Sequence, residues 1–101
     1  MTSVVINDSS LKAVGHAGYA TSGNDIVCAS VSILCYQLAQ WLTFNEEKQE
    51  RLPEIKLESG NVDIKCYPKT EYAEEFKHIF DYILVGFELL ENQFPQNIKI
   101  L

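Results

Sequence analysis

The sequence predicts an α+β two-layer sandwich, in which two helices cover a mainly antiparallel sheet in the order ββαββαβ. Two observations support this prediction. Two pairs of short segments, each pair joined by a turn, carry the β-branched or alternating apolar residues that are typical of hairpins. Two longer segments, one after each hairpin, carry apolar residues every three or four positions, as amphipathic helices do. Hairpins separated by helices favour a sheet with helices packed on at least one face.

The first hairpin and the first helix are expected in the amino-terminal half. Val4-Val5-Ile6 is a β-branched run, residues 7–10 are rich in turn formers, and Leu11 to His16 alternates well enough for a second strand. After a loop that contains glycines, helical spacing runs from Asn24 to Phe44, a length of about 30 Å. Its core-facing stripe consists of Val27, Val31, Leu34, Leu38 and Trp41.

The second half repeats this arrangement. The polar segment 45–51 is expected to face solvent, and alternating strands are expected on both sides of the turn Ser59-Gly60-Asn61. Thr70 is expected to cap the second helix, which has acidic residues in its first turn. The apolar face of this helix comprises Phe76, Ile79, Phe80, Ile83, Phe87 and Leu90. Beyond Pro95, Ile98-Lys99-Ile100 can form a final strand.

The composition indicates one domain over residues 1–101. Hydrophobic residues make up 47% of the 101 positions and charged residues 22%, and no repeat or linker interrupts the chain. A chain of this length buries roughly two-thirds of its unfolded surface, which supports a single core.

The charge and the apolar stretches bear on the partners. The net charge of −6 argues against a nucleic-acid groove, because phosphate binding needs clustered Lys and Arg. The start of the chain lacks the basic and apolar regions of a secretory signal. The stretch from Ile26 to Leu42 is interrupted by polar residues and falls short of the run of about 18 apolar residues that a membrane span requires. We therefore expect a cytoplasmic protein that contacts neither nucleic acid nor a membrane directly.

The three cysteines are expected to be free thiols. Cys28, Cys35 and Cys66 are odd in number and include no CxxC pair, so the sequence suggests neither a disulfide framework nor a zinc site. No metal or other cofactor is expected. Cys35 and Cys66 fit packing positions in the helix and the strand that carry them.

The loop from Gly15 to Gly23 departs from what a core and its turns require. Its three glycines permit positive φ and a close approach to a ligand. If Ser22 or Asn24 caps the following helix, Cys28 falls near its first turn, where unpaired N–H groups favour a thiolate. His16 stands at the end of the preceding strand, and the loop is long enough to bring its imidazole to the helix start. The two residues form a potential nucleophile and base.

Simpler interpretations apply to the same residues. A cysteine in an apolar helix is usually a core residue, and a histidine at a strand end is usually a hydrogen-bonded surface residue. Asp25 by default satisfies orphan N–H groups at the helix start, and Ser32 is by default a buried hydroxyl bonded to the preceding turn. The glycine spacing matches neither a dinucleotide-binding motif nor a P-loop.

The segment GHAGYATSGNDIVCASVS resembles the signature of the Prp family, the ribosomal-processing cysteine proteases of Firmicutes and related bacteria. The similar positions are Gly15-His16-Ala17, Gly23, Asp25, Cys28-Ala29 and Ser32. The similarity extends over nearly the whole chain and includes Gly86 in the second helix and Phe94-Pro95 before the last strand. The fold of the family agrees with the ββαββαβ order.

The resemblance implies a cysteine endopeptidase with Cys28 as nucleophile and His16 as general base. The supporting or substrate-binding positions that it implies are Gly15, Ala17, Gly18, Gly23, Asp25, Ala29 and Ser32. Family members remove a short N-terminal extension from large-subunit ribosomal protein twenty-seven by cutting after an aromatic pair, and they resemble one another in being homodimers. The implied partner is therefore the precursor of that ribosomal protein.

Three points stay open at the level of sequence. No residue can be assigned as the group that orients His16, since Asp25 could instead be a helix cap. Tyr19, Tyr36, Trp41 and Phe44 are candidates for reading the aromatic pair, provided that the fold places them near the cleft. The alternative functions are a non-catalytic peptide-binding α+β dimer associated with ribosome assembly and a thiol redox sensor, for which no resolving cysteine lies nearby in sequence.

Overall fold

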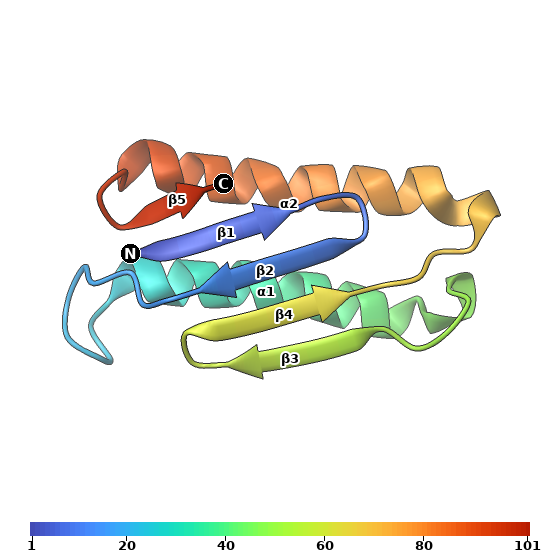
Figure 1. Ribbon diagram of the computed structural model, residues 1–101, viewed down its shortest axis with the longest axis horizontal. Helices are drawn as coiled ribbons and strands as arrows, with labels where there is room; N and C mark the ends of the chain where they lie inside the picture. Colours follow the sequence, from blue (N-terminus) through green and yellow to red (C-terminus); the bar gives the residue numbers. More distant parts are fainter.

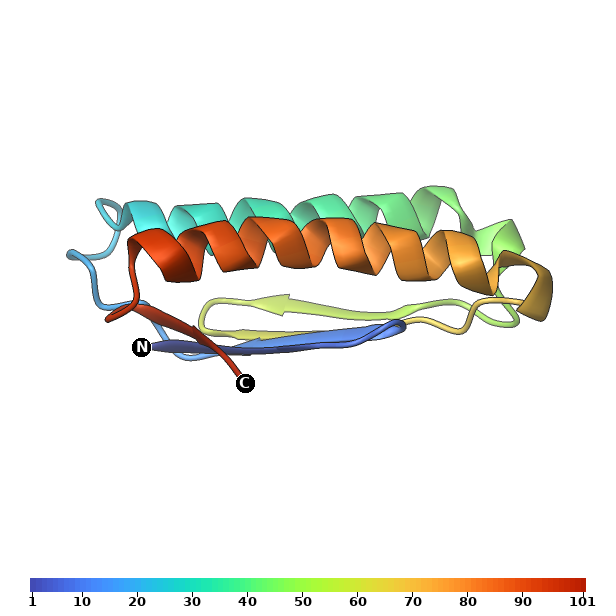
Figure 2. The same ribbon diagram turned by 90° about the horizontal axis from the view of Figure 1, so that it is seen from above.

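The protein consists of two layers, a five-stranded sheet and a pair of long helices (Figure 1). A computed structural model describes residues 1–101. Both helices lie on the same face of the sheet, as Figure 2 shows with the sheet seen edge-on. The elements in chain order are β1 (Thr2–Ile6), β2 (Ser10–Val14), α1 (Ile26–Phe44), η1 (Glu46–Lys48), β3 (Glu54–Glu58), β4 (Asn61–Lys65), η2 (Thr70–Tyr72), α2 (Ala73–Gln93) and β5 (Ile98–Ile100). The predicted two-layer architecture and ββαββαβ order are confirmed.

The strands are arranged in the order β3-β4-β2-β1-β5. All neighbouring pairs are antiparallel except β1 and β5, which are parallel. The register brings apolar side chains into rows across the sheet, because residues paired on neighbouring strands point to the same face. One such row consists of Leu57, Val62, Ala13, Val4 and Ile100. The two free edges of the sheet are β3 and β5.

The core lies between the sheet and the two helices. The side chains of Val4, Leu11 and Ile64 point from the sheet toward the helices and are fully buried. From α2, Phe76 packs edge-on against Trp41 of α1, with ring centroids 4.9 Å apart, and both Phe80 and Phe87 are buried. Burying each such side chain contributes about 1.5–3 kcal/mol. This packing holds α1 at a fixed position above the sheet.

The predicted boundaries are wrong at three places, the first being the start of α1, which lies at Ile26 instead of Asn24. The second strand ends at Val14 instead of His16, because the chain turns at Gly15, which has a φ of +95°. Thr70 does not cap the second helix: it begins the 3-10 turn η2, and α2 starts at Ala73 after Tyr72, which makes no side-chain capping bond. The amide of Tyr72 donates to the carbonyl of Lys69, which closes that tighter turn before the α-helix begins.

The expectation that segment 45–51 faces solvent is wrong for Gln49. Its side chain is 5% exposed, and its amide nitrogen donates to the carbonyls of Leu42 at 3.0 Å and Asn45 at 3.2 Å. Each of these carbonyls also accepts one backbone amide, Leu42 from Asn45 and Asn45 from Lys48, and the buried side-chain amide of Gln49 adds a second donor at the end of α1.

Helix α1 is long and apolar enough by composition to cross a membrane, with a mean hydropathy of 1.4 over its most apolar window. Its interrupting serines and glutamines therefore do not exclude a span on composition alone. A core helix of a soluble protein passes the same test. One side of α1 packs into the core through Val27, Val31, Cys35, Leu38, Ala39 and Leu42.

Candidate active site

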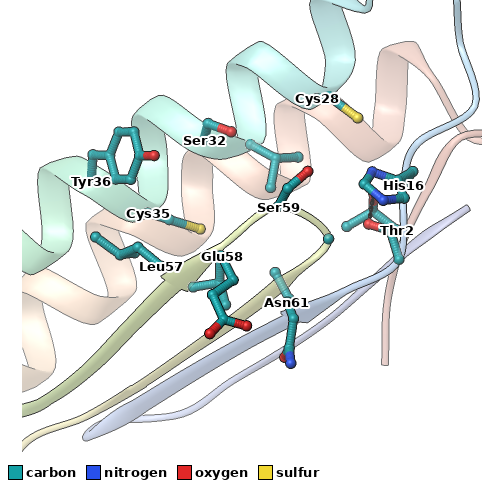
Figure 3. A pocket seen from close by; sticks show the side chains of 15 residues that line it. Thr2, His16, Cys28, Ser32, Cys35, Tyr36, Leu57, Glu58, Ser59 and Asn61 are labelled. Carbon is teal, nitrogen blue, oxygen red and sulfur yellow. Dashed lines mark hydrogen bonds between the residues drawn. The ribbon is translucent and has the colours of Figure 1, made fainter. Parts of the chain in front are cut away.

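A cavity of about 290 Å³ lies between α1 and the β3–β4 hairpin (Figure 3). Its helical wall includes Cys28, Ser32 and Tyr36, the opposite wall is formed by residues 57–62 of the hairpin, and His16 lies at one end. A second hollow, between the loop 18–25 and the start of α1, is also lined by Cys28 and His16. The two residues therefore stand where the two hollows meet.

Cys28 is the third residue of α1, and its side chain is partly exposed. The backbone N–H of Ala17 donates to its Sγ at 3.3 Å. The sulfur thus lies close to two groups that carry partial positive charge, this N–H and the start of the helix. Figure 3 shows the sulfur directed into the cavity on the side where His16 lies.

His16 follows β2 in an exposed position and brings its imidazole to the same cavity as Cys28. Its carbonyl accepts a hydrogen bond of 2.7 Å from the amino nitrogen of Met1, which fixes the backbone at this residue. The ring makes no hydrogen bond to Cys28 or to a carboxylate. Catalytic hydrogen bonds often form only once substrate is bound, so this arrangement is compatible with a nucleophile and base pair.

Asp25, rather than Ser22 or Asn24, is the N-cap of α1. One carboxylate oxygen accepts from the amides of Val27 and Cys28 at 3.0 and 2.9 Å, and the other accepts from those of Tyr19 and Ala20 at 2.9 and 3.3 Å. The hydrogen bond from the Cys28 amide is the main cause that lowers the pKa of Asp25 below its ordinary 3.8. With four backbone N–H partners and no bond to His16, Asp25 ties the loop to the helix and does not orient the imidazole.

Asp25→Asn is expected to lower the melting temperature at neutral pH, because an amide nitrogen replaces one of the two accepting oxygens. A lowered pKa in the folded protein means that the carboxylate stabilises the fold above pH 3.8 and that this contribution is lost as pH falls through the lower folded value. The difference between wild type and variant should therefore shrink between pH 5 and pH 3, measured by thermal unfolding. Asp81→Asn, at an exposed position of α2, is the control. An Asp25→Asn difference that is the same at both pH values would contradict this assignment.

The loop that carries His16 is attached to the carboxyl-terminal segment at Ala17 and at Tyr19. Ala17 is 2% exposed, and its carbonyl accepts from the side-chain amide of Asn97 at 3.1 Å. The ring of Tyr19 meets that of Phe94 edge-on at 5.3 Å. The residues that hold the loop thus include Asn97 and Phe94 from the carboxyl-terminal segment, and local spacing around the loop gives no signal of this contact.

Ser32 and Ala29 lie beside Cys28 on the side of α1 that faces the hollows. Ser32, one helical turn after Cys28, is exposed and lines both hollows. The expectation of a buried hydroxyl bonded to the preceding turn is therefore wrong. Residues four apart share one face of a helix, and here that face looks away from the core.

Only one of the four aromatic candidates lies at the cavity. Tyr36 lines it, whereas Tyr19 packs on Phe94. Trp41 and Phe44 line a separate shallow groove on the outer side of α1. The chain positions alone could not separate these residues, because the choice depends on which face of α1 points to the β3–β4 hairpin.

The other two cysteines are buried thiols. Cys35 is fully buried at the wall of the cavity, and burial raises its pKa to about 12. Burial also raises the pKa of Cys66 to about 12, and its thiol donates to the carbonyl of Ser9 at 3.4 Å. Cys66 follows β4 at the end of the sheet away from Cys28 (Figure 1), so it is not placed to act as a resolving thiol for Cys28. No group of His, Cys, Asp and Glu side chains is arranged to hold a metal ion.

Comparisons with known proteins give one family-model match and several solved structures of similar fold. The family model described as cysteine protease Prp matches residues 1–99. The solved Staphylococcus aureus ribosomal processing protease Prp with a covalently linked product peptide is 22% identical, with a TM-score of 0.76 and coverage of 98% of this chain and 94% of that chain. The same protease with a substrate peptide is 21% identical, with a TM-score of 0.71 and coverage of 99% of this chain and 95% of that chain. The Streptococcus mutans protein SMU.848 is 22% identical, with a TM-score of 0.68 and coverage of 98% of this chain and 89% of that chain. No curated protein matches the sequence.

Proposed function

Because this chain belongs to the Prp family of cysteine proteases, we propose that it removes the N-terminal extension of the precursor of large-subunit ribosomal protein twenty-seven, with Cys28 as nucleophile and His16 as general base. The observation that carries the proposal is the meeting of these two side chains at one cavity, where the sulfur also accepts an N–H hydrogen bond. The solved S. aureus relative, described as a ribosomal processing protease, has been captured with a substrate peptide and with a covalently linked product peptide.

The proposed reaction follows from the positions of these groups. His16 accepts the proton of Cys28, and the thiolate attacks the scissile carbonyl to form a tetrahedral intermediate. His16 then gives the proton to the leaving amine as the scissile carbon–nitrogen bond breaks. The acyl group stays on Cys28 as a thioester, the acyl-enzyme. Water, deprotonated by His16, hydrolyses the thioester and regenerates the thiol. No metal or other cofactor is needed in this sequence of steps.

The donors for the oxyanion are expected in the loop rather than at Cys28 itself. The Cys28 amide donates to Asp25 and is therefore occupied. The Ala17 amide lies 3.3 Å from the sulfur, so it is already close to where the carbonyl oxygen would stand after attack. The next amide, that of Gly18, makes no hydrogen bond within the protein and belongs to a residue that lines the second hollow. Each such donor is worth around 3 kcal/mol of transition-state stabilisation.

The cavity suits an extended peptide with an apolar side chain beside the cleavage site. Val31, Leu57, Val62 and Tyr36 give it an apolar wall. The net charge of −6 favours encounter with a basic ribosomal protein and disfavours binding to RNA. In this proposal the protein acts in the cytoplasm and away from membranes.

A homodimer is also part of the proposal. Its support is the exposure of large apolar side chains on the outer sides of the two helices, where 62% of Ile33 on α1 and 71% of Tyr82 on α2 are accessible. Such side chains are typical of association surfaces when they are grouped.

The proposal is tested by incubating the purified protein with the extended precursor and measuring fragment masses. We expect a single cut after the aromatic pair, while the mature ribosomal protein, as the control substrate, stays intact. An unchanged precursor would contradict the protease function. Binding of the precursor without cleavage would support the non-catalytic peptide-binding alternative.

A further inference from the structure

The turn between β3 and β4 supports the imidazole of His16. A Cβ atom placed on Gly60 would lie 2.8 Å from Nε2, 2.9 Å from Cε1 and 3.3 Å from Cδ2 of this ring. Real Cβ atoms essentially never approach another heavy atom closer than 3.0 Å. The ring therefore occupies the space that any other residue at this position would need for its side chain.

The backbones on either side of this contact are also joined. The amide of Gly15, next to His16, donates to the carbonyl of Gly60 at 2.9 Å. The carbonyl of Gly15 in turn accepts from the hydroxyl of Thr2 at 3.1 Å, and that of His16 accepts from Met1. The turn and the His16 segment are thus fixed to each other at the end of the sheet where Cys28 lies.

No side chain competes with the turn for the role of orienting the imidazole. Neither ring nitrogen makes a hydrogen bond within the protein. The two oxygens of Asp25 are held by four backbone amides. Glu58 lines the cavity but makes no bond to the ring, and its carboxylate lies 3.7 Å from the ammonium of Lys56. The backbone of Gly60, in contrast, lies directly against the ring.

We propose that Gly60 is a positioning residue for the reaction: the turn without a side chain lets the imidazole of His16 lie over it and face Cys28. The proposal rests on the proposed function of His16 as the base. It assigns to a hairpin turn the role that a carboxylate or amide plays in many cysteine and serine proteases. The same hairpin forms one wall of the cavity, so the element that would contact a bound peptide also holds the base.

The first test compares Gly60→Ala and Gly60→Asn with the wild type. Both variants carry a Cβ that displaces the ring, and we expect kcat to fall about 10- to 100-fold in each, with KM within roughly threefold, because a misplaced base costs rate rather than binding. Gly60 has a φ of +71°, so alanine is strained there, whereas asparagine tolerates this conformation. Recovery of wild-type kcat by asparagine would show that strain caused the loss and would overturn the proposal.

A second test uses the alkylation rate of Cys28 by iodoacetamide, which needs no peptide cleavage and so separates failure of this inference from failure of the proposed function. We expect Gly60→Ala and His16→Ala each to slow the reaction, and the double variant to be no slower than His16→Ala alone. Additive losses in the double variant, or an unchanged rate in Gly60→Ala, would overturn the proposal. Gly18→Ala is the control for backbone strain. Gly18 has a φ of +69°, and nothing lies within 4 Å of the added carbon, so the fall in melting temperature of this variant measures the effect of the strained backbone alone.

Discussion

Replacing Cys28 with alanine is expected to reduce cleavage of the precursor by roughly 10⁴-fold or more, because the sulfur forms the acyl bond and no other group can replace it. The melting temperature should stay within a few degrees of the wild type, since the side chain is partly exposed and its loss leaves no sealed cavity in the core. The measurements are the rate of fragment formation by mass spectrometry and thermal unfolding by circular dichroism.

Cys66→Ala is the matched control for this variant. It removes a thiol at the other end of the sheet, where burial raises the pKa to about 12, and it should leave the cleavage rate unchanged. Processing at the normal rate by Cys28→Ala, or loss of activity on removal of Cys66 with the fold intact, would show that the nucleophile has been misassigned.

Replacing His16 with alanine is expected to lower kcat/KM by about 10²- to 10⁴-fold, the range that a positioned general base contributes. The loss should be smaller than for Cys28→Ala, because the thiol and the N–H of Ala17 that faces it remain. The His16 side chain is exposed, so the space it leaves can be entered from solvent. Imidazole added to the medium should therefore restore part of the rate to His16→Gly.

His78→Ala is the control for the histidine variants. His78 lies on α2 with its side chain 74% exposed, and its contact is with Glu74 at 3.8 Å on the same helix. Its replacement should change neither the rate nor the melting temperature. Full activity of His16→Ala without imidazole would remove His16 from the mechanism.

The secondary structure could be predicted from the sequence because it depends on local periodicity. The stripe of phenylalanines in α2 and the alternation in β3 and β4 mark their elements directly. The start of α1 could not be placed in this way, because Ser22, Asn24 and Asp25 are all good capping residues. The choice of Asp25 depends on the amides of Tyr19 and Ala20, which reach its second oxygen only when the loop is folded.

The site could be predicted only in part. Cys28 and His16 stand out through the glycine-bearing loop and the family resemblance, and the structure places both at one cavity. Gly60 lies 44 positions after His16, and a Ser-Gly pair between two strands indicates a hairpin and nothing more. Its contact with the imidazole depends on the strand order, in which β4 lies beside β2 and brings the β3–β4 turn to Gly15.

The intact mass of the protein, quenched with acid during turnover of the precursor, tests the proposed chemistry most directly. We expect a transient adduct equal to the released amino-terminal fragment less one water, mapped by proteolysis to Cys28, removed by hydroxylamine and absent from Cys28→Ala. An adduct on Cys35 or Cys66, or cleavage that proceeds while the enzyme never carries an acyl group on Cys28, would contradict the assignment of this sulfur as the nucleophile.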